Sequence, residues 1–306
     1  MHVAWDDEER AALVALLQSR PDGLSWEQIT DRVAELGSAR ELWSHLVPAD
    51  LLDQTGDGDP RLIEARAQVR SWQDAPFAFL TFMNDFYPAQ LRDVQQMPPF
   101  VFAAGRVLED DRGVCVVGSR RATDHGLNMA AEVSQGLVER SLTVVSGLAR
   151  GIDGAAHRAA LDAHGRTVAV IGTGIERNYP PEHAELQARI TSEGLVLSQF
   201  WPSSPPGKQT FPLRNAVMSA YGLASVVIEA GETSGARIQA RVAVEHGRPV
   251  VLFKSVVEST SWAPSLVGAP GVCVVRSADE ALTAIDKFLE ADAEIDRWLS
   301  SAGEPW

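Results

Sequence analysis

The stretch VVSGLARGIDGAAHRAAL at 144–161 combines groups that could hold a phosphate. An apolar run leads into Ser146 and Gly147, and Arg150 and Gly151 follow before an alanine-rich segment. Glycines allow backbone amides to come close to an anion, and a guanidinium donates two parallel hydrogen bonds to phosphate oxygens. A turn that only reversed the chain would need a glycine but not the arginine. This spacing therefore predicts a site for a phosphate backbone.

Four further apolar runs end in residues of the same kind. The run at 114–118 leads into GSRRATDHG and a helix near 123–140, whose positive end would make an anion site. A long loop at 201–215 and the segment GETSGAR at 231–237 follow two others. The candidate phosphate-binding residues at these strand ends are Gly118, Ser119, Arg120, Arg121, Ser146, Gly147, Arg150, Gly151, Gly172, Gly174, Lys208, Phe211, Arg214, Asn215, Ser234, Gly235 and Arg237.

Each of these features also has a simpler explanation. Glycines after strands often serve only the turn, and Asp153 could merely complement the dipole of the helix that it begins. Trp201 and Phe211 could simply pack the long loop, and Arg237 with Arg241 could form a solvated helix face. One shared ligand explains all the strand ends together, whereas the simpler explanations need a separate cause at each.

The elements that must position these residues follow from the hydrophobic pattern. Helical patterns alternate with short β-branched runs at 114–118, 142–147, 167–174, 195–200, 225–230, 249–253 and 271–275. Continuous apolar strands separated by helices indicate a mostly parallel sheet covered on both faces, which is a doubly wound α/β fold. In such sheets, ligands bind beyond the carboxyl ends of the strands, where the candidate residues lie.

The flanks of this predicted sheet are helical. Residues 1–75 show short helical patterns, with capping-box sequences at 25–28 and 38–41 and a turn-rich break at 53–60. An acidic amphipathic pattern ends the chain. We therefore expect a small helical N-terminal domain at 1–75, a Rossmann-like domain at 76–276 and a C-terminal acidic helix at 277–306.

The charge distribution permits an anion site in the middle of the chain. The 306 residues carry a net charge of −14, which argues against a general nucleic-acid coat protein. Residues 1–75 hold 15 acidic and 7 basic residues, and 255–306 hold 9 and 3. The segment 76–254 between them holds 17 of each and is neutral.

Composition also bounds the setting. A hydrophobic content of 45% with 22% charged residues is typical of a soluble globular protein, and the sequence has no apolar run of 18 residues that would predict a membrane span. The acidic N-terminus has no apolar signal region. Cys115 and Cys273 both lie in apolar runs, so we expect buried free thiols in a reducing cytoplasm.

Several ligand classes lack their motifs. The sequence has no G-x-G-x-x-G, no G-x-x-x-x-G-K-[ST] and no G-x-S-x-G, and its histidines are not spaced as a metal set. We therefore expect no metal and no cofactor. Arginines beside an aromatic loop suit a sugar-phosphate chain with splayed bases, because each stacked base contributes about 1–3 kcal/mol while cations follow the backbone.

With these residues assembled, the sequence resembles the DNA-processing protein A (DprA/Smf) family. The resemblance covers roughly 86–254. The motifs that carry it, in the family's order and spacing, are FYPAQLRDVQQMPPFVFAAG (86–105), which leads into the family's sheet, GSR (118–120), SGLARGIDGAAHRAAL (146–161), TVAVIGTGIERNYPPEHAEL (167–186), FPLRN (211–215), EAGETSGA (229–236) and AVEHGRPVVLF (243–253).

The resemblance implies an extended Rossmann fold that usually dimerises, binds single-stranded DNA and hands it to a RecA-type recombinase, protecting incoming DNA during transformation. It implies no catalysis. By position in the motifs, backbone phosphates would be held by Gly118, Ser119 and Arg120. The pocket floor would come from Ser146, Gly147, Arg150 and Gly151, and its lip from Phe211, Arg214 and Asn215.

The chain departs from the family pattern at several positions. Ala216 and Thr233 stand where the family often has an arginine and a lysine, and Gln199 replaces a usual glutamate. Ala236 and Arg237 replace a small hydroxyl and an apolar residue. Losing two phosphate contacts would lower the salt dependence of binding by up to roughly two units. About 50 residues follow position 254, so we expect the family's C-terminal winged helix to be missing.

Two other functions stay open at this point. A nucleotide-sensing pocket domain of the SLOG type, in a stress or defence system, would fit the lost basic residues and the acidic flanks. A related phosphoribohydrolase is disfavoured, because EAGETSGA at 229–236 is a poor match to its P-G-G-x-G-T run. A purely structural interaction protein would bind neither nucleotides nor oligonucleotides.

Overall fold

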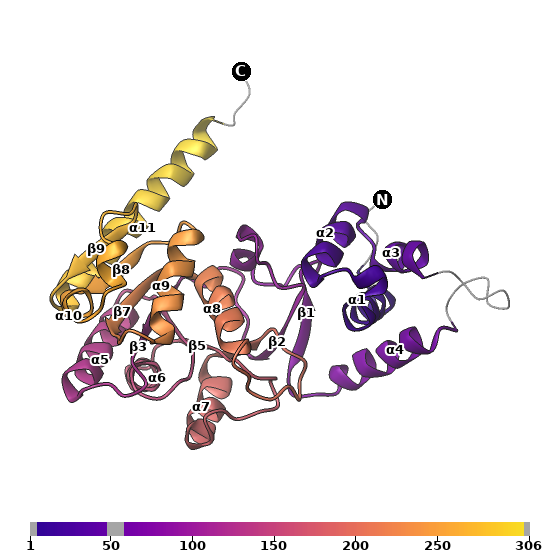
Figure 1. Ribbon diagram of the computed structural model, residues 1–306, viewed down its shortest axis with the longest axis horizontal. Coiled ribbons are helices and arrows are strands. Elements are labelled where there is room, and N and C mark those ends of the chain that lie inside the picture. Colours follow the sequence, from indigo (N-terminus) through magenta and orange to yellow (C-terminus); the bar gives the residue numbers. More distant parts are fainter. Residues whose placement is uncertain (1–4, 48–57, 303–306) are drawn as a thin grey trace.

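A group of helices precedes a nine-stranded sheet in this chain (Figure 1). The computed structural model describes residues 5–47 and 58–302. Most of the turn-rich break predicted at 53–60 lies outside these residues.

The N-terminal helices, which we call the helical unit, are α1 (Asp7–Ser19), α2 (Trp26–Leu36), α3 (Ala39–Leu46) and α4 (Pro60–Gln73). Ser25 and Gln28 form the predicted capping box of α2 in full. At α3, Ser38 accepts a hydrogen bond from the amide of Glu41, as predicted. Buried Glu9 of α1 adds a carboxylate to this helix end, because its Oε1 accepts from Ser38 Oγ at 2.7 Å. The cap therefore ties α1 to α3.

The sheet has the strand order β1-β2-β6-β5-β4-β3-β7-β8-β9. Its strands are β1 (Ala78–Thr81), β2 (Phe100–Gly105), β3 (Gly113–Gly118), β4 (Thr143–Ser146), β5 (Thr167–Val170), β6 (Leu195–Ser198), β7 (Gly222–Glu229), β8 (Val250–Phe253) and β9 (Val272–Val275). The strands from β6 to β9 in this order are parallel, and β1 and β2 add an antiparallel edge. The predicted mostly parallel α/β sheet is confirmed, although the run predicted at 167–174 is a strand only as far as Val170.

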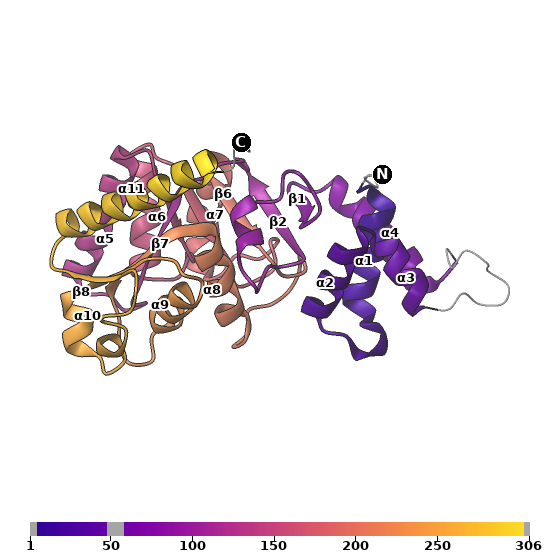
Figure 2. The same cartoon turned by 90° about the horizontal axis from the view of Figure 1, so that it is seen from above.

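Helices cover both faces of the sheet, as the continuous apolar strands require. Figure 2 shows α5 (Asp124–Glu139), α6 (Ile152–Asp162), α7 (Ala184–Glu193) and α11 (Ala278–Ala302) on one face, and α8 (Thr210–Tyr221), α9 (Gly235–Glu245) and α10 (Lys254–Ser259) on the other. The helical unit lies beyond β1, at the edge of the sheet opposite β9 (Figure 1).

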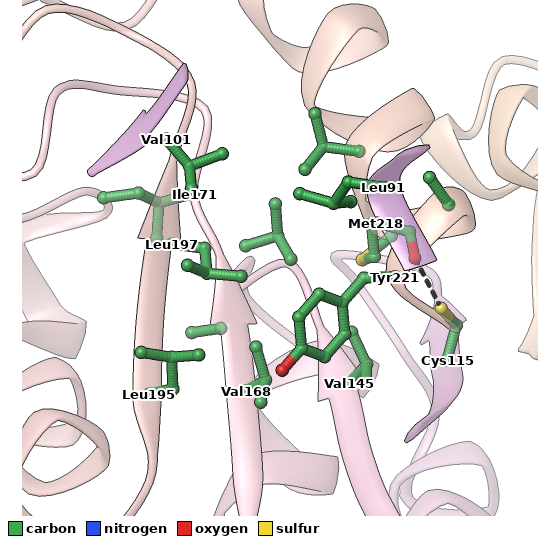
Figure 3. Packing of buried hydrophobic residues seen from close by; sticks show 14 of the residues in the cluster. Leu91, Val101, Cys115, Val145, Val168, Ile171, Leu195, Leu197, Met218 and Tyr221 are labelled. Atoms are coloured by element: carbon green, nitrogen blue, oxygen red, sulfur yellow. Dashed lines mark hydrogen bonds between the residues drawn. The ribbon is translucent and has the colours of Figure 1, made fainter. Parts of the chain in front are cut away.

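The core lies between the strands and these helices. Figure 3 shows Val145 and Val168 of neighbouring strands beside the Tyr221 ring of α8. The thiol of Cys115 donates to the carbonyl of Met218, also in α8, at 3.1 Å. Burial raises the pKa of Cys115 to about 12. The predicted burial of both thiols is wrong for the second one, because Cys273 lies half-buried on the edge strand β9.

A buried ionic network lies at the amino-terminal ends of the central strands β3, β4, β5 and β7. Asp111 Oδ2 accepts from Tyr221 Oη at 2.6 Å and pairs with Arg166 at 2.8 Å, while its Oδ1 accepts from Thr143 Oγ1. The Asp111 side chain is 1% exposed, so these partners offset the cost of burying its charge.

Among the described residues, the structure contains no helix that is both long and apolar enough to span a membrane.

Candidate functional site

The candidate site lies where the chain changes direction across the sheet. From β3 the chain proceeds through β4 and β5 to β6 on one side, and α8 then carries it back to β7 on the other side of β3. Loops that diverge from such a point leave a crevice at the carboxyl ends of the strands. A cavity of about 460 Å³ occupies this position, lined by residues that follow β3, β4 and β7 and by one face of α8.

The loop after β3 is held by the loop after β4. Gly151 has a φ of +70°, and a Cβ there would lie 2.2 Å from the carbonyl oxygen of Ser119. The amide of Ile152 donates to that same carbonyl at 3.2 Å. Arg120 and Arg121 extend from this loop into the cavity wall and are exposed. Within the described part of the chain, neither arginine forms an ion pair.

Arg214 forms the floor of the cavity rather than its lip. Its side chain is buried, and Nη1 donates to the carbonyls of Gly147 and Val170, the latter at 2.8 Å. Its Nε donates to Asn215 Oδ1 at 3.0 Å. A Cβ on Gly147 would lie only 1.7 Å from Arg214 Nη1, so this position has room for glycine alone. The arginine therefore ties the ends of β4 and β5 to α8.

A buried carboxylate balances this guanidinium. Asp153 Oδ2 accepts from the amides of Gly147 at 3.1 Å and Ala149 at 3.3 Å, so it shapes the loop in addition to beginning α6. Burial raises the pKa of Asp153, and the attraction of Arg214 opposes this shift. Burial likewise lowers the pKa of Arg214, and Asp153 opposes it. Each charge thus offsets part of the cost of burying the other.

The rim of the cavity is aromatic. The 201–215 segment was predicted to be a loop, but it is helical from Thr210, and Phe211, Arg214, Asn215 and Met218 share the face of α8 that lines the cavity. This i, i+3, i+4, i+7 spacing is the helical signal that the loop prediction missed. The Arg120 guanidinium lies over the Phe211 ring, with Cζ 5.0 Å from the ring centroid.

A second cavity of about 330 Å³ shares Phe211, Arg120 and Arg214 with the first. The Tyr179 ring lines it, with its centroid 5.7 Å from that of Phe211. Tyr179 was not among the predicted site residues, because it lies within a loop and not at a strand end. The available signals were its place before two prolines and its position within the family motif at 167–186.

Arg150 lines the second cavity with its charge already paired. It forms an ion pair with Glu182, which raises the pKa of Arg150 and lowers that of Glu182. Both side chains are exposed, so water screens this pair. Arg120, Arg150 and Arg214 nevertheless line this one cavity together.

The start of α9 lines the first cavity, whereas the start of α5 does not. Ser234 caps α9, with its Oγ accepting from the amide of Ala236 at 3.2 Å, and Ser234 and Gly235 line the first cavity. The predicted anion site at the start of α5 is wrong, because the Glu229 carboxylate accepts there from Thr123 N at 3.1 Å and Thr123 Oγ1 at 2.7 Å. The positive end of α9 therefore lies at the cavity, where it would attract an anion.

Of the predicted site residues, the structure brings together around the two cavities Gly118, Ser119, Arg120, Arg121, Gly147, Arg150, Gly172, Phe211, Arg214, Asn215, Ser234 and Gly235. It leaves outside both cavities Ser146, Gly151, Gly174, Lys208 and Arg237. The Ser146 hydroxyl is buried and donates to Val116 O at 2.6 Å. Among the residues that the structure describes, no three histidine, cysteine or acidic side chains gather as metal ligands would.

Comparison with known proteins assigns the family. A sequence model described as DNA recombination-mediator protein A matches residues 78–285. Protein Smf of Synechocystis is 41% identical over 177 residues, which are 56% of this chain and 44% of that protein, so the match spans less than half of that relative. The DNA processing protein DprA of Streptococcus pneumoniae is 36% identical over 237 residues, 76% of this chain and 83% of that protein.

Solved structures agree with this assignment. The X-ray structure of the S. pneumoniae DprA matches with a TM-score of 0.67 at 28% identity and covers 90% of this chain and 95% of that one. A Helicobacter pylori DprA structure, whose subject is that protein's single-stranded DNA binding mode, shares the fold with a TM-score of 0.61 at 21% identity, covering 70% of this chain and 97% of that one. As its motifs predicted, this chain belongs to the DNA recombination-mediator protein A family, which is the DprA/Smf family.

Proposed function

We propose that this protein binds single-stranded DNA across its two cavities and delivers it to a RecA-type recombinase. The observation that carries the proposal is the meeting of three features at the switch point of the sheet. They are Arg120 and Arg121, which form no ion pair with any residue that the structure describes, the positive end of α9, and the Phe211 rim. Family membership, and the DNA-processing role in its relatives' names, support the same reading.

Different residues of the site would contact the phosphates and the bases of the DNA. Backbone phosphates would contact Arg120, Arg121 and the amide of Gly235 at the start of α9, because these donors converge on one cavity. Bases would stack on Phe211, since aromatic faces bind bases without sequence preference. Nothing in this scheme requires a covalent step, so we propose that the protein acts by binding alone.

Arg120→Ala tests this proposal in a fluorescence anisotropy titration of a dT oligomer over a series of salt concentrations. We expect much weaker binding and a salt slope reduced by about 0.7, the value for one lost single-strand phosphate contact. Arg237→Ala is the matched control, because Arg237 is an exposed arginine outside both cavities. Wild-type affinity and slope in Arg120→Ala would refute the site assignment.

A nucleotide-sensing pocket is the second candidate function. Thr233 lines the first cavity at a position where the resemblance leads one to expect a lysine, which weakens the case for a polyanion. A thermal-shift screen of mononucleotides and cyclic nucleotides against oligonucleotides separates the two candidates. Stabilisation by mononucleotides alone would favour the sensor.

Self-association, the domain division and the location in the cell are further parts of the proposal. Two copies would associate through the edge strand β9 and α11, where a cavity of about 570 Å³, the exposed Val274 and the exposed Ile295 lie. The division into 1–75, 76–276 and 277–306 would then separate a helical unit, the DNA-binding part and a contact for self-association. Light scattering of the purified chain measures whether two copies associate.

A recombination mediator acts where recombinase and DNA meet, so we propose the cytoplasm as its location.

A further inference from the structure

Trp201 leaves the end of β6 and packs against the helical unit. Its ring stacks on Phe100 at a centroid distance of 4.5 Å and on Trp72 of α4 at 5.9 Å, and it meets the edge of Trp26 of α2 at 5.7 Å. Trp26 is fixed in turn, because its indole N–H donates to Leu17 O at 2.8 Å. Trp201 was one of the aromatic residues predicted beside the arginines, but in the structure it lines neither of the two site cavities.

The residues that follow Trp201 hold a second segment of the chain. Pro202 O accepts from the amide of Glu176 at 3.1 Å, and Ser204 O accepts from the amide of Gly174 at 2.9 Å. Ser203 O accepts from the Arg177 guanidinium at 3.0 Å. The segment 174–177 therefore rests on the segment 201–204 along its whole length.

Both segments lead directly to the aromatic rim. Tyr179 follows the first segment by two residues, and the second continues into α8, where Phe211 is in the first turn. The two rings meet at a centroid distance of 5.7 Å; Phe211 lines both cavities and Tyr179 lines the second. A displacement of Trp201 would move the backbone that carries both rings, whereas Arg120, Arg121 and Ser234 belong to other loops.

We infer that the helical unit positions the base-stacking rim of the DNA site, with Trp201 as the positioning residue that joins them. This inference rests on the proposed binding of single-stranded DNA. It gives the helical unit a role in holding bases but not phosphates. Arg120 lies over the Phe211 ring, but its own loop is held by Gly151 and Ile152, so we expect the phosphate contacts to stay.

Two probes of equal length separate bases from phosphates: a dT oligomer and an oligomer of abasic deoxyribose phosphates. We expect wild type to prefer dT, and Trp201→Leu to lose at least about fivefold of that preference, which corresponds to the lower end of the stacking contribution of one base. The salt slope should stay unchanged, because the number of phosphate contacts stays unchanged. Trp201→Phe, which keeps an aromatic ring, should restore most of the preference.

Trp26→Leu repeats the test from within the helical unit and should shift the same ratio. Trp43→Leu is its matched control: Trp43 is a buried tryptophan of α3 whose ring lies beneath the Arg61 guanidinium, 5.1 Å away, and among the described residues it stacks on no other ring. This control should lower the free energy of unfolding but leave the ratio unchanged.

An unchanged preference in folded Trp201→Leu and Trp26→Leu would overturn the inference, and so would an equal loss in Trp43→Leu. Equal wild-type affinity for the two probes would overturn it too, because no stacking would then need positioning. Failure of wild type to bind either probe would instead contradict the proposed function itself.

Discussion

Gly147→Ala is the substitution that most directly tests how the site is built. The methyl group would lie 1.7 Å from Arg214 Nη1, so the guanidinium must move. Moving it breaks the hydrogen bonds from Nη1 to the carbonyls of Gly147 and Val170, and it separates Arg214 from the buried charge of Asp153.

The size of the effect follows from those contacts. A hydrogen bond to a charged group contributes about 1.5–3 kcal/mol, so two of them contribute at least about 3 kcal/mol. The neighbouring cavity lets the displaced guanidinium reach water, which favours the lower end of this range. We therefore expect Gly147→Ala to lower the free energy of unfolding by about 3 kcal/mol, a large part of a typical total of about 5–15 kcal/mol.

Urea denaturation followed by circular dichroism measures this change, and the dT titration shows whether the displaced Arg214 alters binding. Gly231→Ala is the matched control, because Gly231 lines the same cavity but a Cβ there would have no atom within 4 Å. We expect the control to change stability by no more than about 0.5 kcal/mol. Equal urea midpoints for the two variants would refute the packing argument.

Two further predictions concern buried ionisable groups. Burial lowers the pKa of His157 from 6.5 to about 3, so its stabilising contribution is complete above pH 6.5 and is lost as the pH falls from 6.5 towards 3. Urea unfolding at several pH values should show that the wild type loses up to about 1.4 kcal/mol of its free energy of unfolding per pH unit in this window. His157→Asn should not show this loss. The same pH dependence in His157→Asn would assign the effect to another group. Asp111→Asn should lower the free energy of unfolding by about 3–5 kcal/mol, because it leaves Arg166 without its buried partner. The control is Asp162→Asn, in the exposed pair with Arg189, which should leave the urea midpoint unchanged. Similar midpoints for these two aspartate variants would contradict the weight given to burial.

The sequence by itself determined the sheet and the strand ends. Alternation of β-branched runs with helical patterns is a local property, and it predicted the parallel strands from β3 to β9 and the position of the site at their carboxyl ends. The motif at 146–161 likewise identified the family before any contact was known. The antiparallel strands β1 and β2 were not predicted, because short runs in a segment rich in turns carry little periodic signal.

Only the tertiary structure decided what each side chain does. The order of the strands brings Arg214 of α8 to the Gly147 carbonyl and Glu229 to the start of α5, so one predicted cation is the floor of the site and one predicted anion site already holds a carboxylate. The same folding carries Trp201 away from the arginines to the helical unit and brings Tyr179 to Phe211. Partners that are distant in sequence depend on how the strands are ordered and on which face each helix packs, and the local pattern of residues encodes neither directly.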